Sequence, residues 1–141
     1  MTTAIVTGGS GDIGRACAEA LIADGYRVGI LDLASNALTQ IAAEIGATPL
    51  AADVTNEPDV ERALVDFGAV PDVVVNNAGI GRFASLLDMP IETFRLQLDV
   101  NLVGSFIVAR AAARGMVERG SGRILNVTSI NAITTVPGTG S

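Results

Sequence analysis

The length, composition and charge of the chain exclude several kinds of protein. Its 141 residues suffice for one domain but leave no room for a separate substrate domain, and a net charge of −6 argues against nucleic acid as a partner. A single cysteine excludes a disulfide framework, and no uninterrupted apolar run reaches the ~18 residues of a membrane span. Residues 1–4 lack the basic start of a signal peptide. We therefore expect a cytoplasmic protein without a membrane partner.

Short apolar runs alternate with helix-like stretches along the whole chain. Runs rich in Val, Ile and Leu and bounded by Gly or Asp are typical of strands buried on both faces of a parallel sheet. Five such runs lie at residues 4–6, 28–31, 49–52, 73–75 and 124–127. Helices are predicted between them at residues 13–24, 34–45, 57–67 and 91–119, the third with Asn56 as candidate N-cap and Pro58 in its first turn. The alternation predicts an α/β fold with a doubly wound parallel sheet of the Rossmann type.

The last predicted helix is apolar on nearly every side between residues 102 and 113. A helix that covers one face of a sheet needs only one apolar stripe. Two interpretations stay open: a deeply buried helix, or a helix that packs on the sheet with one side and on another subunit with the other. The second predicts a homo-oligomer, either a dimer or a tetramer.

A glycine-rich loop separates the first predicted strand from the first helix. The segment Gly9-Ser10-Gly11-Asp12-Ile13-Gly14 matches the spacing Gly-x-Gly-x-x-Gly, in which glycines let the backbone approach a pyrophosphate and the helix N-terminus offers free N–H groups. A glycine-rich turn without a ligand is the alternative. The position between strand and helix favours a dinucleotide site, with Gly8, Ser10, Asp12, Ile13 and Gly14 as cofactor-binding residues.

An acidic residue follows the second predicted strand at the distance that such a site requires. Asp32 lies 18 residues beyond Gly14, where its carboxylate would accept hydrogen bonds from both hydroxyls of the adenosine ribose. A 2′-phosphate would face a like charge there, and no arginine or lysine follows nearby in the sequence. The pattern therefore predicts NAD as the cofactor, bound by Asp32 and its neighbour Leu33, although Asp32 could instead cap the next helix.

At this point the residues resemble the short-chain dehydrogenase/reductase family. The loop of that family reads Thr-Gly-x-x-x-Gly-x-Gly, and Thr7, Gly8 and Gly14 match it. The middle glycine is replaced by Asp12, with Gly11 just before it. This departure makes the local path of the loop, rather than cofactor binding itself, the open point.

Further matches follow in the order of the family. Asp53-Val54 resembles the pair that brackets the adenine ring, and Asn76-Asn77-Ala78-Gly79 resembles a motif that stabilises the sheet and lines the cofactor cleft. Asn101 resembles an asparagine that supports a proton relay, and Ser129, after Thr128, a serine that binds the substrate carbonyl. These matches also have structural explanations without a ligand: Asn76 and Asn77 could close a turn, Asn101 could be a polar residue on a helix, and Ser129 could cap the next element. The resemblance implies cofactor contacts from Asp53, Val54, Asn77, Ala78 and Gly79, and catalytic roles for Asn101 and Ser129.

Two catalytic residues of the family have no counterpart in these 141 residues. The resemblance implies a tyrosine about a dozen residues after the serine, with a lysine four residues later that lowers the tyrosine pKa. The chain contains one tyrosine, Tyr26, before the second predicted strand, and neither lysine nor histidine. We therefore expect residues 1–141 alone to be inactive, and we expect no metal site.

The fold is also expected to be incomplete, because a dinucleotide domain of this type has six strands and five are predicted. Residues 1–141 would then form an incomplete Rossmann domain with a bare edge at the fifth strand. Three origins fit: part of a longer chain, a truncated product, or a natural short protein.

Two functions follow. The first is an NAD-dependent oxidoreductase acting on a small-molecule ketone or secondary alcohol. The second is a non-catalytic nucleotide-binding or interaction module.

Overall fold

The structure, a computed structural model, describes residues 2–129; residue 1 and residues 130–141 of the predicted domain 1–141 lie outside this part. The described residues form one five-stranded parallel sheet in the order β3-β2-β1-β4-β5. The strands are β1 (Thr3–Thr7), β2 (Arg27–Asp32), β3 (Thr48–Ala51), β4 (Val73–Asn76) and β5 (Arg123–Asn126). The predicted α/β fold with a doubly wound parallel sheet is confirmed, and each strand lies within one residue of its predicted bounds.

The first three helices are α1 (Asp12–Ala23), α2 (Asn36–Ile45) and α3 (Glu57–Phe67). Side-chain caps mark the starts of α2 and α3. Asn56 caps α3 as predicted, because its side-chain oxygen accepts a hydrogen bond from the backbone N–H of Asp59 at 3.3 Å. Helix α2 begins two residues later than predicted because Ser35 is its N-cap, with an extended backbone and a side chain that accepts from the N–H of Leu38.

The long predicted helix at residues 91–119 is interrupted. Helix α4 (Ile91–Leu98) and helix α5 (Ser105–Arg119) are joined by a π-helical segment, Asp99–Gly104. A Cβ added to Gly104 would lie 2.7 Å from a methyl carbon of Val54, so the segment ends where the helix approaches the chain after β3 most closely. Such π segments are common at functional sites, and apolar periodicity alone does not reveal them.

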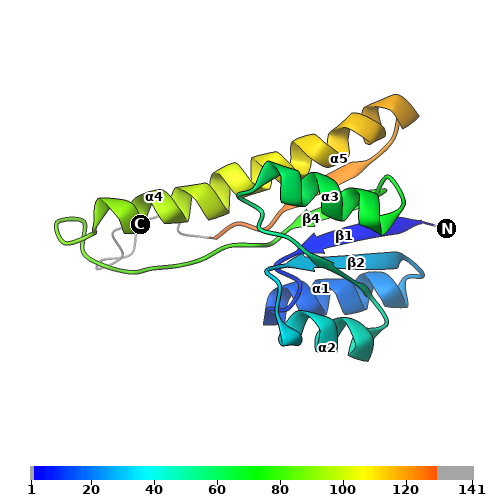
Figure 1. Ribbon diagram of the computed structural model, residues 1–141, viewed down its shortest axis with the longest axis horizontal. Coiled ribbons are helices and arrows are strands. Elements are labelled where there is room, and N and C mark those ends of the chain that lie inside the picture. Colours follow the sequence, from blue (N-terminus) through cyan, green and yellow to red (C-terminus); the bar gives the residue numbers. More distant parts are fainter. Residues whose placement is uncertain (1, 130–141) are drawn as a thin grey trace.

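Helices cover both faces of the sheet (Figure 1). Helices α1 and α2 pack on one face, where Val6 and Ile30 lie in one apolar cluster. Helices α3 and α5 cover the other face, where Ile5, Leu31 and Val74 lie in a second cluster. Alternate residues of β1 thus enter different cores, as the period of a strand requires.

The long helical segment is buried on one side only. Ile107, Val108 and Ala112 pack into the second cluster, whereas Leu102 is 65 % and Phe106 59 % exposed. Among residues 2–129, this segment is therefore not buried on all sides, and a subunit partner for its exposed side stays a prediction.

The same segment, Ile91–Arg119, is the one helix among the described residues that is long and apolar enough to cross a membrane, judged by length and composition only. Its richest window has a mean hydropathy of 1.3 and is 28 % buried. Because the core helix of a soluble protein passes the same test and one side of α5 packs on the sheet, we regard this as a weak indication.

Strand β5 forms one edge of the described sheet. All four of its residues are exposed, including Ile124 and Leu125. The expected apolar edge is therefore present in this part of the chain.

Candidate functional site: a cleft at the carboxyl ends of the strands

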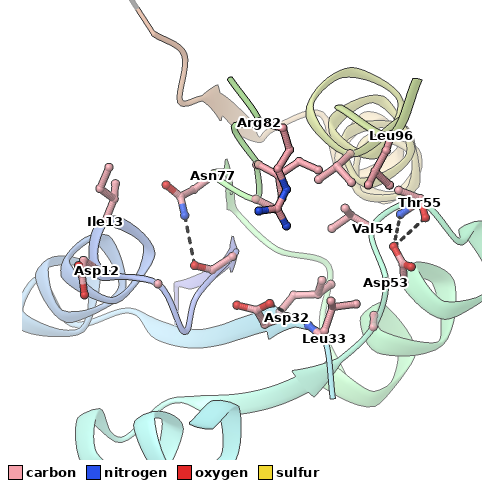
Figure 2. Close-up of a pocket in the computed structure, with 18 residues that line it drawn as sticks. Asp12, Ile13, Asp32, Leu33, Asp53, Val54, Thr55, Asn77, Arg82 and Leu96 are labelled. Atoms are coloured by element: carbon pink, nitrogen blue, oxygen red, sulfur yellow. Dashed lines mark hydrogen bonds between the residues drawn. The ribbon is translucent and has the colours of Figure 1, made fainter. Parts of the chain in front are cut away.

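A cleft of about 700 Å³ opens at the carboxyl ends of the strands. The chain crosses from one side of the sheet to the other at β1, which lies between β2 and β4. In open α/β sheets, ligands bind at such a reversal point. All the predicted cofactor residues except Ser10 and Gly14 line this cleft (Figure 2), namely Gly8, Asp12, Ile13, Asp32, Leu33, Asp53, Val54, Asn77, Ala78 and Gly79.

The glycine loop has the geometry that a closely approaching ligand needs. Gly8 has a φ of +63°, and its N–H donates to the carbonyl of Leu31 at 2.8 Å. A Cβ added to Gly14 would lie 2.1 Å from the carbonyl oxygen of Gly8. Gly14 therefore does not touch the cleft but lets α1 begin directly against the loop, so that the free N–H groups of its first turn face the cleft near Gly11 and Ile13.

Asp12 does not cap helix α1. Gly11 is the N-cap, and no side chain bonds to the N–H groups at this end. Asp12 is instead the first helical residue and lines the cleft. Its carboxylate therefore interacts with the helix through the dipole alone.

The carboxylate of Asp32 lies at the end of β2, inside the cleft. One oxygen accepts from the backbone N–H of Leu33 at 2.8 Å, and the other accepts from the backbone N–H and the hydroxyl of Ser10. These bonds fix the carboxylate on the ligand side of the loop. Ser10 thus acts through Asp32, which explains why Ser10 itself is not a lining residue.

The two residues of the predicted pair after β3, Asp53 and Val54, contribute differently to the cleft. The Asp53 carboxylate turns toward its own loop and accepts from the N–H and hydroxyl of Thr55, at 2.8 and 2.7 Å (Figure 2). Val54 is 8 % exposed and provides an apolar wall of the cleft. The pair therefore lines the cleft with one apolar side chain and one carboxylate that is already bonded.

The two asparagines after β4 hold neighbouring elements together. Asn77 donates its amide to the carbonyls of Thr7 and Gly8, at 3.1 and 3.2 Å, and its backbone N–H donates to the Thr7 hydroxyl. Asn76 donates to Asn126 on β5 and to the carbonyl of Ser105 at the start of α5. The motif thus fixes the glycine loop against the loop after β4 and fastens α5 to the sheet.

The two predicted catalytic residues lie outside the lining of the cleft. The Asn101 side chain accepts from the N–H of Ile80 at 2.8 Å and donates to its carbonyl at 2.9 Å, so it clamps a residue that does line the cleft. Ser129 follows β5, is exposed, and does not line it. Tyr26 precedes the amino end of β2, at the opposite edge of the sheet.

Several lining residues were not predicted from the sequence. Arg82 projects its guanidinium into the cleft above Asp32 and Leu33, and Leu96 lines the same side (Figure 2). The other lining residues not predicted are Gly11, Leu31, Ala52, Thr55, Ile80 and Val100. Arg82 lies three residues beyond the Asn-Asn-Ala-Gly motif, so an extension of that motif into the loop would have found it. Nothing in the sequence marks Leu96 and Val100 as cleft residues, because both are only apolar residues of a predicted helix.

The arrangement can hold an extended ligand between the start of α1, the last turn of α4 and the carboxyl ends of the strands β1, β2, β3 and β4. Carboxylate, glycine loop and apolar wall follow one another as a dinucleotide would need them. Within residues 2–129, no group of three or more Cys, Asp and Glu side chains is placed to hold a metal ion.

Comparison with known proteins finds relatives whose similarity extends over nearly the whole chain. A family model described as short chain dehydrogenase matches residues 2–141. The chain is 38 % identical over 145 residues to a 3-oxoacyl-[acyl-carrier-protein] reductase of Synechocystis, covering 96 % of this chain and 58 % of that protein. It is 35 % identical to a sorbitol dehydrogenase of Cereibacter sphaeroides, covering 90 % of this chain and 52 % of that one. The chain thus spans about half the length of these curated relatives.

Solved structures agree with the fold. A 3-oxoacyl-[acyl-carrier protein] reductase with bound NAD from Brucella melitensis superposes with a TM-score of 0.92 at 34 % identity, covering 98 % of this chain and 57 % of that one. An actinorhodin polyketide ketoreductase with NADPH has a TM-score of 0.90 at 30 % identity, again covering 98 % and 57 %. Relatives of this fold therefore hold nicotinamide cofactors of both kinds.

Proposed function

Because this chain belongs to the short-chain dehydrogenase/reductase family, we propose that it is the cofactor-binding part of an NAD-dependent oxidoreductase that interconverts a ketone and a secondary alcohol. The relatives are oxidoreductases of this family, which use a nicotinamide cofactor. The cleft fits such a group, because its glycine loop leaves the space that a Cβ would fill and the first turn of α1 offers free N–H groups.

The observation that carries the choice of NAD is the Asp32 carboxylate. It is fixed inside the cleft by Leu33 and Ser10, where the hydroxyls of an adenosine ribose would be accepted and a 2′-phosphate repelled. The next arginine along the chain is Arg62. Arg82 does line the same cleft, but it belongs to the loop after β4 rather than to the end of β2. We therefore propose that Asp32 determines the preference for NAD.

The test is the ratio of the dissociation constants for NADPH and NADH before and after Asp32→Ala. Removing the carboxylate should weaken NADH binding and strengthen NADPH binding, so that the ratio falls at least tenfold. Leu33→Ala is the matched control, since it removes cleft surface but no charge. Equal affinities for both cofactors in the unmodified protein would refute the role of Asp32.

The chemistry that NAD supplies when bound is the donation or acceptance of a hydride. Around it, we propose that the Ser129 hydroxyl orients the substrate carbonyl and that Asn101 supports the proton relay while holding the Ile80 backbone at the cleft. A proton donor of suitable pKa is the missing part, because residues 1–141 contain no lysine or histidine and Tyr26 lies at the other edge of the sheet. A polypeptide of these residues alone should therefore show no turnover of NADH with ketones.

A second candidate function, which uses the same cleft, is a nucleotide-binding or interaction module without redox chemistry. The two proposals share the cleft and differ in one observable. Binding of NADH without turnover by the protein in its natural length would favour the module, and turnover with any ketone would exclude it.

The exposed side of the π-helical segment and of α5 supports a further element of the proposal, a homo-oligomer. Phe106, Leu102 and Val103 are all more than a third exposed, and burial of such side chains is worth about 1.5–3 kcal/mol each. A second copy of the same helix offers a matching surface. Light scattering should give a dimer or tetramer that Phe106→Arg dissociates; a monomeric unmodified protein would refute it. A cytoplasmic location and a small-molecule substrate complete the proposal.

A further inference from the structure

The cleft has an unusual balance of charge. Three carboxylates line it, those of Asp12, Asp32 and Asp53, against the single guanidinium of Arg82. Among the described residues, no ion pair joins a carboxylate to the side chain of Arg82, nor to those of Arg27, Arg95 and Arg123, and of these four arginines Arg82 alone lines the cleft. A guanidinium that projects into a cleft and forms no ion pair with a carboxylate is available to bind a planar oxyanion.

The position of Arg82 is fixed by an unusual side chain on α4. The Gln97 side chain is 6 % exposed, and its oxygen accepts from the backbone N–H of Arg82 at 2.7 Å. Its amide nitrogen is buried without a hydrogen-bond partner among the described residues. A buried unpaired amide costs free energy that an apolar residue at the same place would avoid. The presence of glutamine at position 97 is therefore not explained by a gain in stability, but it is explained by the hydrogen bond that Gln97 accepts from the Arg82 backbone N–H.

Gln97 acts together with Asn101, four residues later. Asn101 binds the N–H and the carbonyl of Ile80, and Gln97 binds the N–H of Arg82. Two amide side chains from one helical segment thus hold three backbone groups of the loop at residues 80–82. The loop is fixed at both ends, and the side chain of Arg82 extends from it into the cleft (Figure 2).

We propose that Arg82 is the oxyanion-binding residue of this cleft and that Gln97 is its positioning residue. The inference rests on the proposed function and names a chemistry for it: the ligand presents a phosphate or carboxylate oxygen to the wall formed by Arg82 and Leu96. The two sources of such an oxygen are the pyrophosphate of the dinucleotide and an acidic group on the carbonyl substrate.

The test compares Arg82→Gln with Arg95→Gln in the purified protein. Arg95 is a matched control because it is an exposed arginine of α4 that does not line the cleft. In one arm, ADP and adenosine are titrated, and the ratio of their dissociation constants reports the pyrophosphate contact. In the other arm, oxamate is titrated into the protein saturated with NADH, which reports a carboxylate contact beside the cofactor.

Arg82→Gln should weaken binding at least tenfold in one of the two arms, because a charge-assisted bidentate contact is lost, while Arg95→Gln should change neither arm more than twofold. A loss in the ADP arm assigns the oxyanion to the pyrophosphate, and a loss in the oxamate arm assigns it to the substrate. If Arg82→Gln matches Arg95→Gln in both arms while NADH binds normally, the inference is overturned and the proposed function stands. Absence of NADH binding in the unmodified protein would overturn both.

Gln97→Met tests the positioning role. It should leave the melting temperature unchanged or higher, because the unpaired buried amide is removed, and still weaken the arm that Arg82→Gln weakens. Wild-type affinity in Gln97→Met would refute this role. Arg82→Lys should restore part of the affinity, since it keeps the charge but not the planar fork.

Discussion

Replacing Gly14 by alanine should disrupt the start of α1 and the loop beneath it. The added Cβ would lie 2.1 Å from the Gly8 carbonyl oxygen and 2.8 Å from the Asn77 amide nitrogen, whereas carbon and oxygen atoms in contact are normally about 3.3–3.6 Å apart. Relief requires a backbone shift of more than about 1 Å, because Gly8 is itself held by its hydrogen bonds to Leu31 and Asn77.

Two effects oppose each other in this variant. Alanine favours a helix over glycine by about 1 kcal/mol, and forcing a group into a packed site costs about 1–3 kcal/mol, sometimes more. With backbone as the obstacle, we expect a net loss of about 1–2 kcal/mol in the free energy of unfolding. The distorted loop should also weaken NADH binding at least tenfold.

Urea unfolding followed by circular dichroism gives the stability, and calorimetric titration with NADH gives the affinity. Gly11→Ala is the matched control for stability only, because the nearest contact of its added Cβ is 3.5 Å, an ordinary separation, whereas Gly11 itself lines the cleft. A Gly14→Ala protein as stable as the unmodified one, with unchanged NADH affinity, would refute the steric reasoning.

Two further predictions concern acidic residues. The pKa of Asp72 is lowered chiefly by the hydrogen bond from the Thr3 backbone N–H, then by the Thr3 hydroxyl and the Arg119 charge. The ionised carboxylate therefore contributes stability above its ordinary pKa of 3.8, and this is lost as the pH falls through the lowered value. Asp72→Asn should cost about 1 kcal/mol at pH 7, and the gap to the unmodified protein should close below pH 3; a gap that persists there would contradict the assignment. Asp12→Asn should lower the free energy of unfolding by less than about 1 kcal/mol, because only the dipole interaction is lost; a larger loss would indicate a capping bond.

The strands could be predicted from the sequence because a parallel sheet buries both faces of each strand. Runs such as residues 73–75 therefore contain apolar residues without interruption. Most of the residues that line the cleft could be predicted because glycine and aspartate at these spacings are typical of dinucleotide sites. Ser10 was predicted as a cofactor contact, which stays a prediction; its hydrogen bonds to Asp32 could not be predicted from the spacing.

What the sequence did not reveal depends on contacts between distant segments. The π-helical segment forms where Gly104 meets Val54, fifty residues earlier in the chain. Arg82 enters the cleft because Gln97 holds its backbone. Buried Gln97 looks like a surface residue in the sequence, so its role could not be predicted from the local pattern.

Calorimetric titration of the purified protein with NADH and NADPH tests the central claim, that this cleft is an NAD site. We predict one NADH bound per chain, at least tenfold more tightly than NADPH. A folded protein that shows no saturable binding of NADH, or that binds NADPH as tightly, would contradict it.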